Sequence, residues 1–388
     1  MISERIKNIN PSATLAIAAK AKLQSRKKGI DVLSLSAGEP DFDTPEHIKN
    51  AAIGAINEGF TKYTTTSGIP ELKDAICAKF KTDNVLSYAP ENILVSNGAK
   101  QALYNIIQTL INPFDEVLIP VPYWVSYMEM VRLADGICIF LPCGEQLKIT
   151  ADLIEKHATS KTKLLIINSP SNPTGMVYSK KELEDIASVC LERKIFVISD
   201  EIYEKLIYDS SHFSIAQVSR VMKKQTAVVN GVSKAYAMTG WRIGYVACEK
   251  EIISAATKLQ DHTTSGANSI AQKAAFAAIT GPQTCVEEMR REYKKRRDYV
   301  IERLSAIKGI SVQKPDGAFY VFPDISQIMK KKKISGSALF CDQLLTRENV
   351  ALIPGSAFGN DNYIRLSFAA SFSTIKEALD RLERFIIS

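Results

Sequence analysis

Short, continuously apolar segments alternate with helical segments along much of the chain, and this pattern most constrains the fold. Residues 163–168 and 195–199 are apolar at nearly every position rather than at every second one, which is typical of strands buried on both faces. Further strands are expected at residues 31–36, 92–96, 116–120 and 137–141. Because helical segments lie between most of them, we expect an α/β fold with a mainly parallel sheet and helices on both faces.

The pattern changes after residue 267, and the length of 388 residues favours two domains. A long charged helix is expected over residues 283–307, followed by a shorter strand-and-helix region. We therefore expect a large domain of residues 46–282 and a smaller domain formed by residues 1–45 and 283–388. Two local signals near the start favour a helix from Pro11 to Gly29 and another that begins at Thr44-Pro45-Glu46, with Thr44 as its cap.

Composition argues against several classes of function. A net charge of +7 is modest for this length, and the basic runs at 26–28 and 330–333 lack interleaved aromatic residues, so nucleic-acid binding is not expected. The seven cysteines form no Cys-x-x-Cys pair and the four histidines are dispersed, so we expect neither disulfides nor a metal centre. No segment is typical of a signal peptide or a membrane span, which makes the cytoplasm the expected compartment.

The segment from Ser233 to Gly244 carries the strongest chemical signal. It holds Lys234 among small and apolar residues, where partial desolvation lowers the pKa of an amine and favours its nucleophilic form. Arg242 follows eight positions later and offers a planar fork suited to a phosphate group. A carbonyl-attacking amine beside a phosphate clamp suggests pyridoxal phosphate chemistry. On its own, however, a lysine is more often a solvated surface residue.

Other polar residues follow predicted strands, where ligands bind in open α/β sheets. Asp200 could pair with a pyridine nitrogen and Tyr203 with a ring hydroxyl, although an isolated Asp is more often a cap or turn residue. Asn172 lies in a rigid turn between a serine and a proline, and Gly98 opens a helix whose free N–H groups suit an anion. Trp124 could stack on a planar ring or simply fill the core.

Three motifs occur together in this order: Ser171-Asn172-Pro173-Thr174-Gly175, Ser199-Asp200-Glu201-Ile202-Tyr203, and Ser233-Lys234 followed by Gly240-Trp241-Arg242-Ile243-Gly244. With them, essentially the whole chain resembles the class I aminotransferases of the fold-type I pyridoxal-phosphate enzymes. The segments at 37–45, 122–127 and 237–242 look most like the bacterial aspartate and aspartate–prephenate aminotransferase branch. The resemblance implies the fold-type I architecture and pyridoxal 5'-phosphate as cofactor.

The resemblance also implies roles for individual residues in the reaction. Lys234 would form the Schiff base with the cofactor and then move the proton at the substrate Cα. Asp200 would pair with the ring nitrogen, while Tyr203 and Asn172 would hold the ring oxygen. Trp124 would stack on the ring. The catalytic residues implied are Asp200, Tyr203 and Lys234.

Phosphate binding is assigned by the resemblance to Arg242, Ser233 and the backbone at Gly98 and Ala99. Tyr63 matches a tyrosine that reaches the phosphate of the neighbouring subunit, which implies a homodimer with shared active sites. The implied cofactor-binding set is Tyr63, Gly98, Ala99, Lys100, Trp124, Asn172, Asp200, Tyr203, Ser233, Lys234 and Arg242.

Substrate binding is implied for a second group of residues. Arg365 would grip the α-carboxylate, assisted by Gly38 and Asn172. Lys100 matches a lysine that this branch uses for the distal carboxylate, and Thr14 matches a threonine linked with prephenate use. The substrate-binding set is Thr14, Gly38, Lys100, Trp124, Asn172 and Arg365.

The chain departs from the wider family at two places. Gly231 stands where many members carry a phosphate-binding serine, three residues before the lysine. The region at residues 262–266 contains no counterpart of the arginine that animal-type aspartate aminotransferases use for the distal carboxylate. Acidic specificity would then depend mainly on Lys100.

These observations predict a cytoplasmic, homodimeric aminotransferase that exchanges amino groups between aspartate and 2-oxoglutarate by a ping-pong mechanism, with prephenate as a further acceptor. An aromatic or alanine aminotransferase, or a C–S lyase on the same fold, is the first alternative. A non-enzymatic regulator that senses pyridoxal phosphate is a remote one, because residues 31–35 begin the fold too early for a fused DNA-binding domain.

Overall fold

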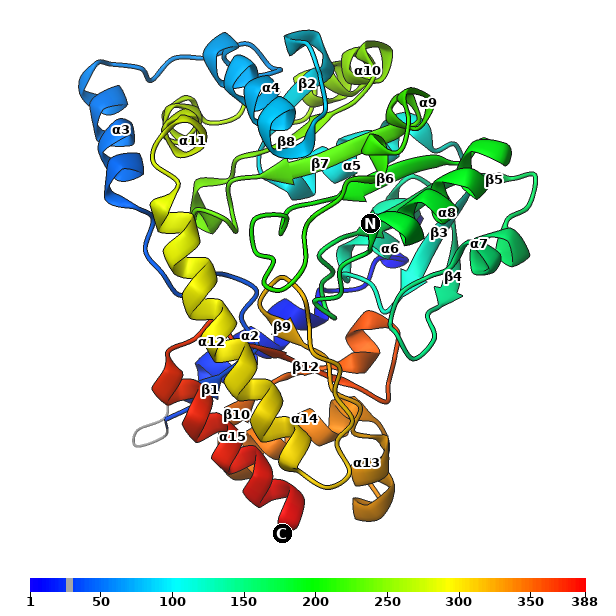
Figure 1. Ribbon diagram of the computed structural model, residues 1–388, viewed down its shortest axis with the longest axis vertical. Helices are drawn as coiled ribbons and strands as arrows, with labels where there is room; N and C mark the ends of the chain where they lie inside the picture. Colours follow the sequence, from blue (N-terminus) through cyan, green and yellow to red (C-terminus); the bar gives the residue numbers. More distant parts are fainter. Residues whose placement is uncertain (26–30) are drawn as a thin grey trace.

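The computed structural model describes residues 1–25 and 31–388 and contains one large sheet and two small ones (Figure 1). The strands of the large sheet are β2 (Ile93–Ser96), β3 (Glu116–Val121), β4 (Ile137–Pro142), β5 (Thr162–Asn168), β6 (Phe196–Asp200), β7 (Thr226–Gly231) and β8 (Gly244–Ala247). They are hydrogen-bonded in the order β2-β8-β7-β6-β5-β3-β4. Strand β8 runs antiparallel to both of its neighbours, and the remaining pairs are parallel.

Strand β5 illustrates why these segments are continuously apolar. Leu164 and Ile166 pack into a hydrophobic cluster on one face of the sheet, whereas Leu165 and Ile167 pack into a different cluster on the other face. Successive side chains of a strand point to opposite faces, so a strand covered on both sides needs apolar residues at every position. The predicted strand at 163–168 is therefore confirmed.

Helices surround the large sheet. They are α3 (Glu46–Asn57), α4 (Pro70–Asn84), α5 (Ala99–Leu110), α6 (Ser126–Leu133), α7 (Ala151–His157), α8 (Lys180–Glu192), α9 (Arg220–Lys224), α10 (Lys250–Asp261) and α11 (Ser269–Thr280). Short 3-10 turns are η1 (Pro90–Asn92), η2 (Ile215–Gln217), η3 (Thr239–Trp241) and η4 (Gly355–Phe358). Helix α8 begins at Lys180 because the Ser179 hydroxyl accepts from the Glu182 N–H and the Glu182 carboxylate accepts from the Ser179 N–H.

The rest of the chain forms the smaller sheets and the helices around them. Its elements are α1 (Glu4–Lys7), α2 (Ala13–Ser25), β1 (Leu33–Ser34), α12 (Thr284–Ala306), β9 (Tyr320–Val321), α13 (Ser326–Lys332), α14 (Ser337–Glu348), β10 (Val350–Ala351), β11 (Ile353–Pro354), β12 (Ile364–Ser367) and α15 (Phe372–Ile387). Strand β1 pairs with β10, and β12 lies between β11 and β9. Helix α12, which confirms the expected long helix, runs from the large sheet to the smaller ones (Figure 1).

One hydrophobic cluster joins the segment after β6 to the smaller sheets. Tyr203, Leu206 and Tyr208 belong to the same buried cluster as Phe319 and Phe368. Residues just beyond the carboxyl end of a large-sheet strand thus share a hydrophobic cluster with the residue before β9 and the residue after β12. This packing places the smaller sheets over the strand ends at which the predicted site lies.

Two predicted helix boundaries differ from the structure. Pro45, expected at the first helical position, lies at the cap position of α3. Thr44 does not cap the helix because its hydroxyl accepts from Trp241 Nε1 at 2.9 Å and donates to the Ala237 carbonyl at 2.6 Å. Helix α2 covers Ala13–Ser25 and so begins two residues after the predicted start at Pro11, while the predicted end at Gly29 and the basic run 26–28 lie outside the described residues.

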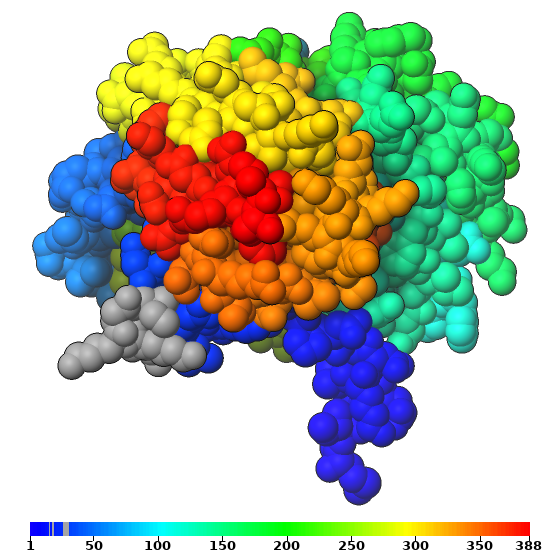
Figure 2. Space-filling model, turned by 90° about the horizontal axis from the view of Figure 1, so that it is seen from below, coloured from blue at the N-terminus to red at the C-terminus, as the bar shows by residue number. Residues whose placement is uncertain are grey.

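The N-terminal residues project from the body of the molecule (Figure 2). Met1, Ile2 and Ile6 expose most of their side chains there. Among the described residues, no helix combines the length and the apolar character that a membrane crossing needs.

Candidate active site

A cavity of about 620 Å³ lies at the carboxyl ends of the large-sheet strands, and its other wall comes from the smaller sheets. It brings together every predicted site residue except Gly98 and Tyr63. Those that line it are Thr14, Gly38, Ala99, Lys100, Trp124, Asn172, Asp200, Tyr203, Ser233, Lys234, Arg242 and Arg365.

Lys234 follows β7 and points into the cavity. Its Nζ donates to the Gly38 carbonyl oxygen at 2.5 Å, which ties the large sheet to the loop after β1. Burial lowers the pKa of Lys234 to about 8, with Arg365 and Arg242 lowering it further and Glu39 opposing the shift. The structure thus places an amine in the cavity that is partly neutral near physiological pH, as a nucleophile requires.

Asp200 is the last residue of β6, and its carboxylate is fixed from several sides. Tyr127 Oη donates to Asp200 Oδ2 at 2.7 Å, and the Ile202 N–H donates to Oδ1 at 3.3 Å. Asn168 Nδ2, at the end of the neighbouring strand β5, donates to the Asp200 carbonyl oxygen at 2.9 Å. Burial raises the pKa of Asp200 to about 6, while the Tyr127 hydrogen bond opposes that shift.

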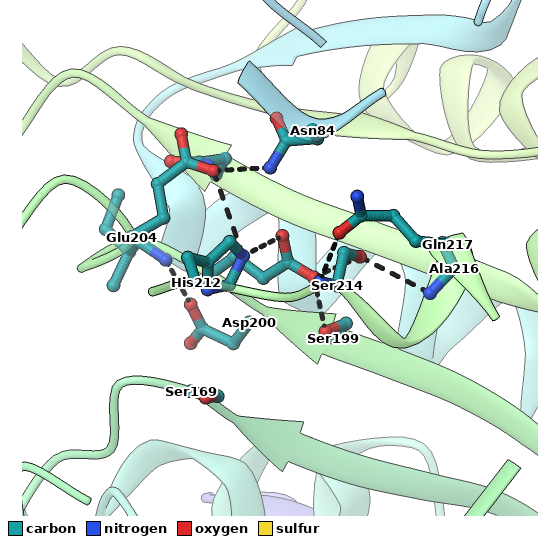
Figure 3. A network of polar contacts seen from close by, with 12 residues as sticks. Asn84, Ser169, Ser199, Asp200, Glu204, His212, Ser214, Ala216 and Gln217 are labelled. Carbon is teal, nitrogen blue, oxygen red and sulfur yellow. Dashed lines mark hydrogen bonds and ion pairs between the residues drawn. The ribbon is translucent and has the colours of Figure 1, made fainter. Parts of the chain in front are cut away.

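A buried polar network lies beside Asp200 (Figure 3). Glu201 accepts from the Ser199 and Ser214 hydroxyls at 2.7 and 2.6 Å, and His212 Nε2 donates to its other oxygen at 2.8 Å. Burial alone would lower the pKa of His212, but the Glu201 and Glu204 carboxylates together outweigh burial and raise it. Ligand atoms of Glu201, Glu204 and His212 lie within 4.8 Å of one another, yet each of these side chains has protein partners.

Arg365, on β12, lies opposite Lys234 and is almost fully buried. Its Nη1 donates to Asn172 Oδ1 at 2.9 Å and its Nη2 to the Ser36 carbonyl at 2.8 Å. Nε has no hydrogen-bond partner within residues 1–25 and 31–388. Because Asn172 Oδ1 accepts from Arg365, the amide NH₂ of Asn172 is left to donate to another group.

Arg242 and Gly98 meet at the start of α5. Gly98 has a φ of 83°, and a Cβ built there would lie only 2.4 Å from Arg242 Nη2, so only glycine allows this approach. Arg242 Nη1 donates to the Thr239 carbonyl at 2.8 Å, which holds the guanidinium at the helix N-terminus. A guanidinium beside free helix N–H groups favours an anion.

Gly231 has a structural reason to be glycine. It pairs with Gly244 across β7 and β8, and a Cβ built on Gly231 would lie 2.9 Å from Gly244 Cα and 3.0 Å from the Ile243 carbonyl. A serine side chain therefore does not fit in this backbone arrangement. The absent hydroxyl is a consequence of strand packing, while Ser233 still lines the cavity.

Lys100 and Thr14 approach the cavity from separate elements. Lys100 Nζ lies 4.9 Å from the centre of the Trp124 ring, and burial lowers the pKa of this lysine. Thr14, on α2, shares a hydrogen bond of 3.0 Å with Ser12, which also lines the cavity. Lys100 thus adds a further cation to the cavity that Arg242, Lys234 and Arg365 also line.

Tyr63 lies outside this cavity. It is fully exposed, in the segment between α3 and α4. Its side chain therefore has no role in the site of its own chain, and the prediction that it serves a neighbouring subunit stays a prediction.

Several residues that line the cavity have no role predicted from the sequence. Tyr127 lies three residues after Trp124, about one helical turn, and this spacing could have indicated a shared site. Asn168 ends β5 as Asp200 ends β6, which was a usable signal. Tyr320 gave no signal because its segment, Ala318-Phe319-Tyr320-Val321, reads as ordinary core.

Pyridoxal phosphate requires an amine, an acid for its ring nitrogen, donors for its ring oxygen and a phosphate site. The cavity offers Lys234, Asp200 and the free amide NH₂ of Asn172, each fixed by contacts described above. The Arg242 guanidinium, packed against Gly98 at the N-terminus of α5, offers a site suited to a phosphate. The residues present therefore fit this cofactor.

Comparisons with known proteins agree with this geometry. The sequence profile described as aminotransferase class I and II matches residues 30–382. An aspartate aminotransferase of Bacillus sp. (strain YM-2) is 51% identical over 100% of this chain and 99% of its own length. A probable aspartate/prephenate aminotransferase of Rickettsia conorii is 45% identical over 100% and 98% of the two chains.

Solved structures show the same likeness. The aspartate aminotransferase of Thermus thermophilus with maleate superposes with a TM-score of 0.94 at 42% identity, covering 99% of both chains. That of Rhizobium meliloti gives a TM-score of 0.95 at 41% identity, covering 100% of this chain and 99% of the other. With the fold, the cavity and the full-length match in agreement, this chain belongs to the class I and II aminotransferases and is a pyridoxal-phosphate-dependent enzyme.

Proposed function

We propose that this enzyme transfers the amino group between aspartate and 2-oxoglutarate by a ping-pong mechanism and that prephenate is a further amino acceptor. The observation that carries the proposal is the pair of cations, Arg365 and Lys100, that line one cavity with Lys234. Two cations suit a substrate with two carboxylates. The names of the relatives from Bacillus and Rickettsia support both substrates.

Each half-reaction moves a proton at the substrate Cα. Pyridoxal phosphate, when bound, supplies an electron sink for the carbanion that forms there. Lys234 removes and returns the Cα proton, for which a pKa near 8 is well matched. Asp200, held by Tyr127, would keep a positive charge on the ring nitrogen, while Tyr203 and Asn172, whose Oδ1 accepts from Arg365, would donate to the ring oxygen.

The remaining residues of the cofactor-binding set bind and orient the cofactor. Arg242, Ser233 and the N–H groups at Gly98 and Ala99 would hold the phosphate, and Trp124 would stack on the ring.

The two substrate carboxylates bind two different cations of the cavity. Arg365 takes the α-carboxylate in a bidentate pair, with Gly38 and Asn172 beside it. Lys100 takes the distal carboxylate, and Thr14 contacts the larger ring of prephenate.

The fully exposed position of Tyr63 supports a homodimer in which this residue reaches the phosphate of the partner's site. The separate sheets support a large domain of residues 46–282 and a smaller domain of residues 1–45 and 283–388. All seven cysteine thiols in the described residues are free, which supports a cytoplasmic location.

Donor selectivity tests the proposal. The purified enzyme in its pyridoxal form is mixed with aspartate, glutamate, alanine or phenylalanine, and conversion to the pyridoxamine form is followed by absorbance. Prephenate is then compared with 2-oxoglutarate in the reverse half-reaction. We expect aspartate to react faster than alanine, and rapid reaction with alanine but none with aspartate would contradict the proposal.

The variant Lys100→Met tests whether Lys100 binds the distal carboxylate of the substrate. We expect kcat/KM for aspartate to fall about tenfold to a hundredfold, as for a lost charge-assisted hydrogen bond, with little change for alanine. Lys258→Met, which removes an exposed lysine from the adjacent helix α10, is the matched control. Equal losses for aspartate and alanine in Lys100→Met would remove Lys100 from this role.

A further inference from the structure

Tyr320 is the one buried tyrosine on β9, and it contacts three of the predicted site residues. Its hydroxyl lies 2.8 Å from the Tyr203 hydroxyl. Its ring centre lies 4.4 Å from the Arg365 guanidinium carbon. A Cβ built on Gly38 would lie 3.1 Å from the Tyr320 hydroxyl, so this group also borders the loop that accepts from Lys234.

The direction of the hydrogen bond between the two phenols follows from proton counting. A phenol carries one proton and can donate only once. If Tyr203 donates to the ring oxygen of the cofactor, its own oxygen can only accept from Tyr320. Donation from Tyr320 polarises the Tyr203 hydroxyl and makes it a stronger donor, because hydrogen bonds in a chain reinforce one another.

The ring of Tyr320 faces the flat guanidinium of Arg365. Phe358 lies on the same guanidinium, with its ring centre 5.1 Å from the Arg365 carbon. Aromatic rings attract a cation placed over their faces, and the attraction is stronger in a desolvated site. These contacts, with the hydrogen bonds to Asn172 and Ser36, hold the plane of Arg365 before a substrate arrives.

We propose that Tyr320 is a positioning residue of this site, whose hydroxyl donates to Tyr203 and whose ring sets the plane of Arg365. The inference rests on the roles proposed above for Tyr203 and Arg365. One side chain of a small sheet would then act on both the cofactor side and the substrate side of the cavity.

Other charged groups also face the two phenols. Asp200 comes from the end of β6, and Lys234, with its Nζ 5.9 Å from the Tyr203 ring centre, from the segment after β7. Arg365 comes from β12 and Glu39 from the loop after β1. Removing the Tyr320 hydroxyl leaves all four in place. A change caused by that removal therefore reports the hydrogen bond between the phenols.

The first test uses Tyr320→Phe, which deletes the hydroxyl and keeps the ring. The enzyme is loaded with pyridoxal phosphate, and the cofactor absorbance is titrated with pH. With Tyr203 a weaker donor, the proton shared between the ring oxygen and the Lys234 nitrogen is held more firmly. We expect the midpoint pH of this absorbance titration to be roughly half a unit higher than in the unchanged enzyme, about the effect of one weakened neutral hydrogen bond.

The second test removes the ring with Tyr320→Met, and with Tyr320→Leu if the first variant does not fold. Succinate is a four-carbon dicarboxylate without an amino group, so it binds without reacting, and calorimetry measures its affinity for the loaded enzyme. We expect the ring-deleting variant to bind succinate roughly tenfold more weakly, as for a lost desolvated cation–π contact. Tyr320→Phe should bind it within about twofold of the unchanged enzyme.

Tyr208→Phe is the matched control. Tyr208 is buried in the same hydrophobic cluster, donates to the Ala318 carbonyl and lies under Arg297 at 4.8 Å, but it does not line the cavity. It should change neither the titration nor succinate binding.

A Tyr320→Phe midpoint equal to those of the unchanged enzyme and Tyr208→Phe would overturn the hydroxyl part of the inference. Equal succinate affinity in Tyr320→Phe and the ring-deleting variant would overturn the ring part. If the unchanged enzyme shows neither a titration nor succinate binding, the failure lies with the proposed function itself.

Discussion

The two walls of the cavity are built in different ways. On the large-sheet wall, Asp200 ends β6, and Lys234 follows the adjacent strand β7 three residues after it ends. On the opposite wall, Arg365 and Tyr320 come from two strands of a small sheet, and Gly38 comes from a loop about 280 residues away from Tyr320 in sequence. The first wall is fixed by one sheet, whereas the second depends on how distant segments pack. A substitution that loosens the packing of the small sheet should therefore weaken substrate binding more than it slows the chemical step.

The largest expected effect lies on the large-sheet wall. Lys234→Ala removes the group that moves the Cα proton, so the rate of transamination should fall by at least about 10³-fold. A loss of this size is within the range of general acid–base catalysis, and the loss of the covalent bond to the cofactor adds to it. Turnover with aspartate and 2-oxoglutarate measures it, and a thermal melt verifies folding. Activity at the unchanged rate would place the chemistry elsewhere.

The opposite wall should respond differently. Arg365→Lys keeps the charge but loses the planar fork, so the dissociation constant of succinate should rise roughly a hundredfold, as for about two lost charge-assisted hydrogen bonds. The pH titration of the cofactor without succinate should move far less than in Tyr320→Phe. A large shift of the titration midpoint in Arg365→Lys with unchanged succinate affinity would contradict the assignment of substrate binding to this wall.

A salt bridge outside the cavity fixes the loop that carries Gly38. Arg296, on α12, donates to both carboxylate oxygens of Asp41 at 2.8 and 2.9 Å, and its side chain is 8% exposed. Arg296→Gln should lower the free energy of unfolding by about 2 kcal/mol and raise KM for aspartate severalfold. Denaturant unfolding and steady-state kinetics measure these effects.

Arg291 provides the control on the same helix. Its side chain is 70% exposed and pairs with Glu287, so Arg291→Gln should change the unfolding free energy by less than about 0.5 kcal/mol. KM should stay the same in this variant. Similar KM values for Arg296→Gln and Arg291→Gln would show that the loop holds its position without the salt bridge.

The smallest expected effect concerns pH. Burial lowers the pKa of Lys234 to about 8, and the neutral amine is the reactive form. Its population rises with pH, so the rate at which the cofactor-free enzyme captures pyridoxal phosphate should increase about fivefold from pH 7 to pH 8. Stopped-flow absorbance measures this rate. A rate that rises tenfold per unit up to pH 10 would show an unshifted amine.

Much of the large sheet could be predicted because its signals are local. An apolar run such as residues 163–168 reports burial on both faces, and polar residues at strand ends mark the ligand side. Thr44 shows where local signals fail. Its hydroxyl donates to Ala237 and accepts from Trp241 Nε1 at 2.9 Å, so tertiary partners replace the expected helix cap.

Residues that act through distant neighbours could not be predicted. Tyr320 has apolar neighbours in sequence, and only the pairing of β9 with β12 brings it to Arg365. The reason for Gly231 was equally hidden, since it depends on Gly244 in the next strand of the sheet. Sequence patterns report burial and local turns, but they do not report which buried groups meet.

The peptide oxygens around the two central cations have a thermodynamic consequence. The Gly38 carbonyl accepts from Lys234, and the Ser36 carbonyl accepts from Arg365. The Arg365 guanidinium is therefore partly solvated by a neutral peptide dipole before substrate arrives, while its Nε still has no acceptor among the described residues. Part of the desolvation of this cation is thus already compensated in the folded protein, so an incoming α-carboxylate gains less than it would from a bare guanidinium.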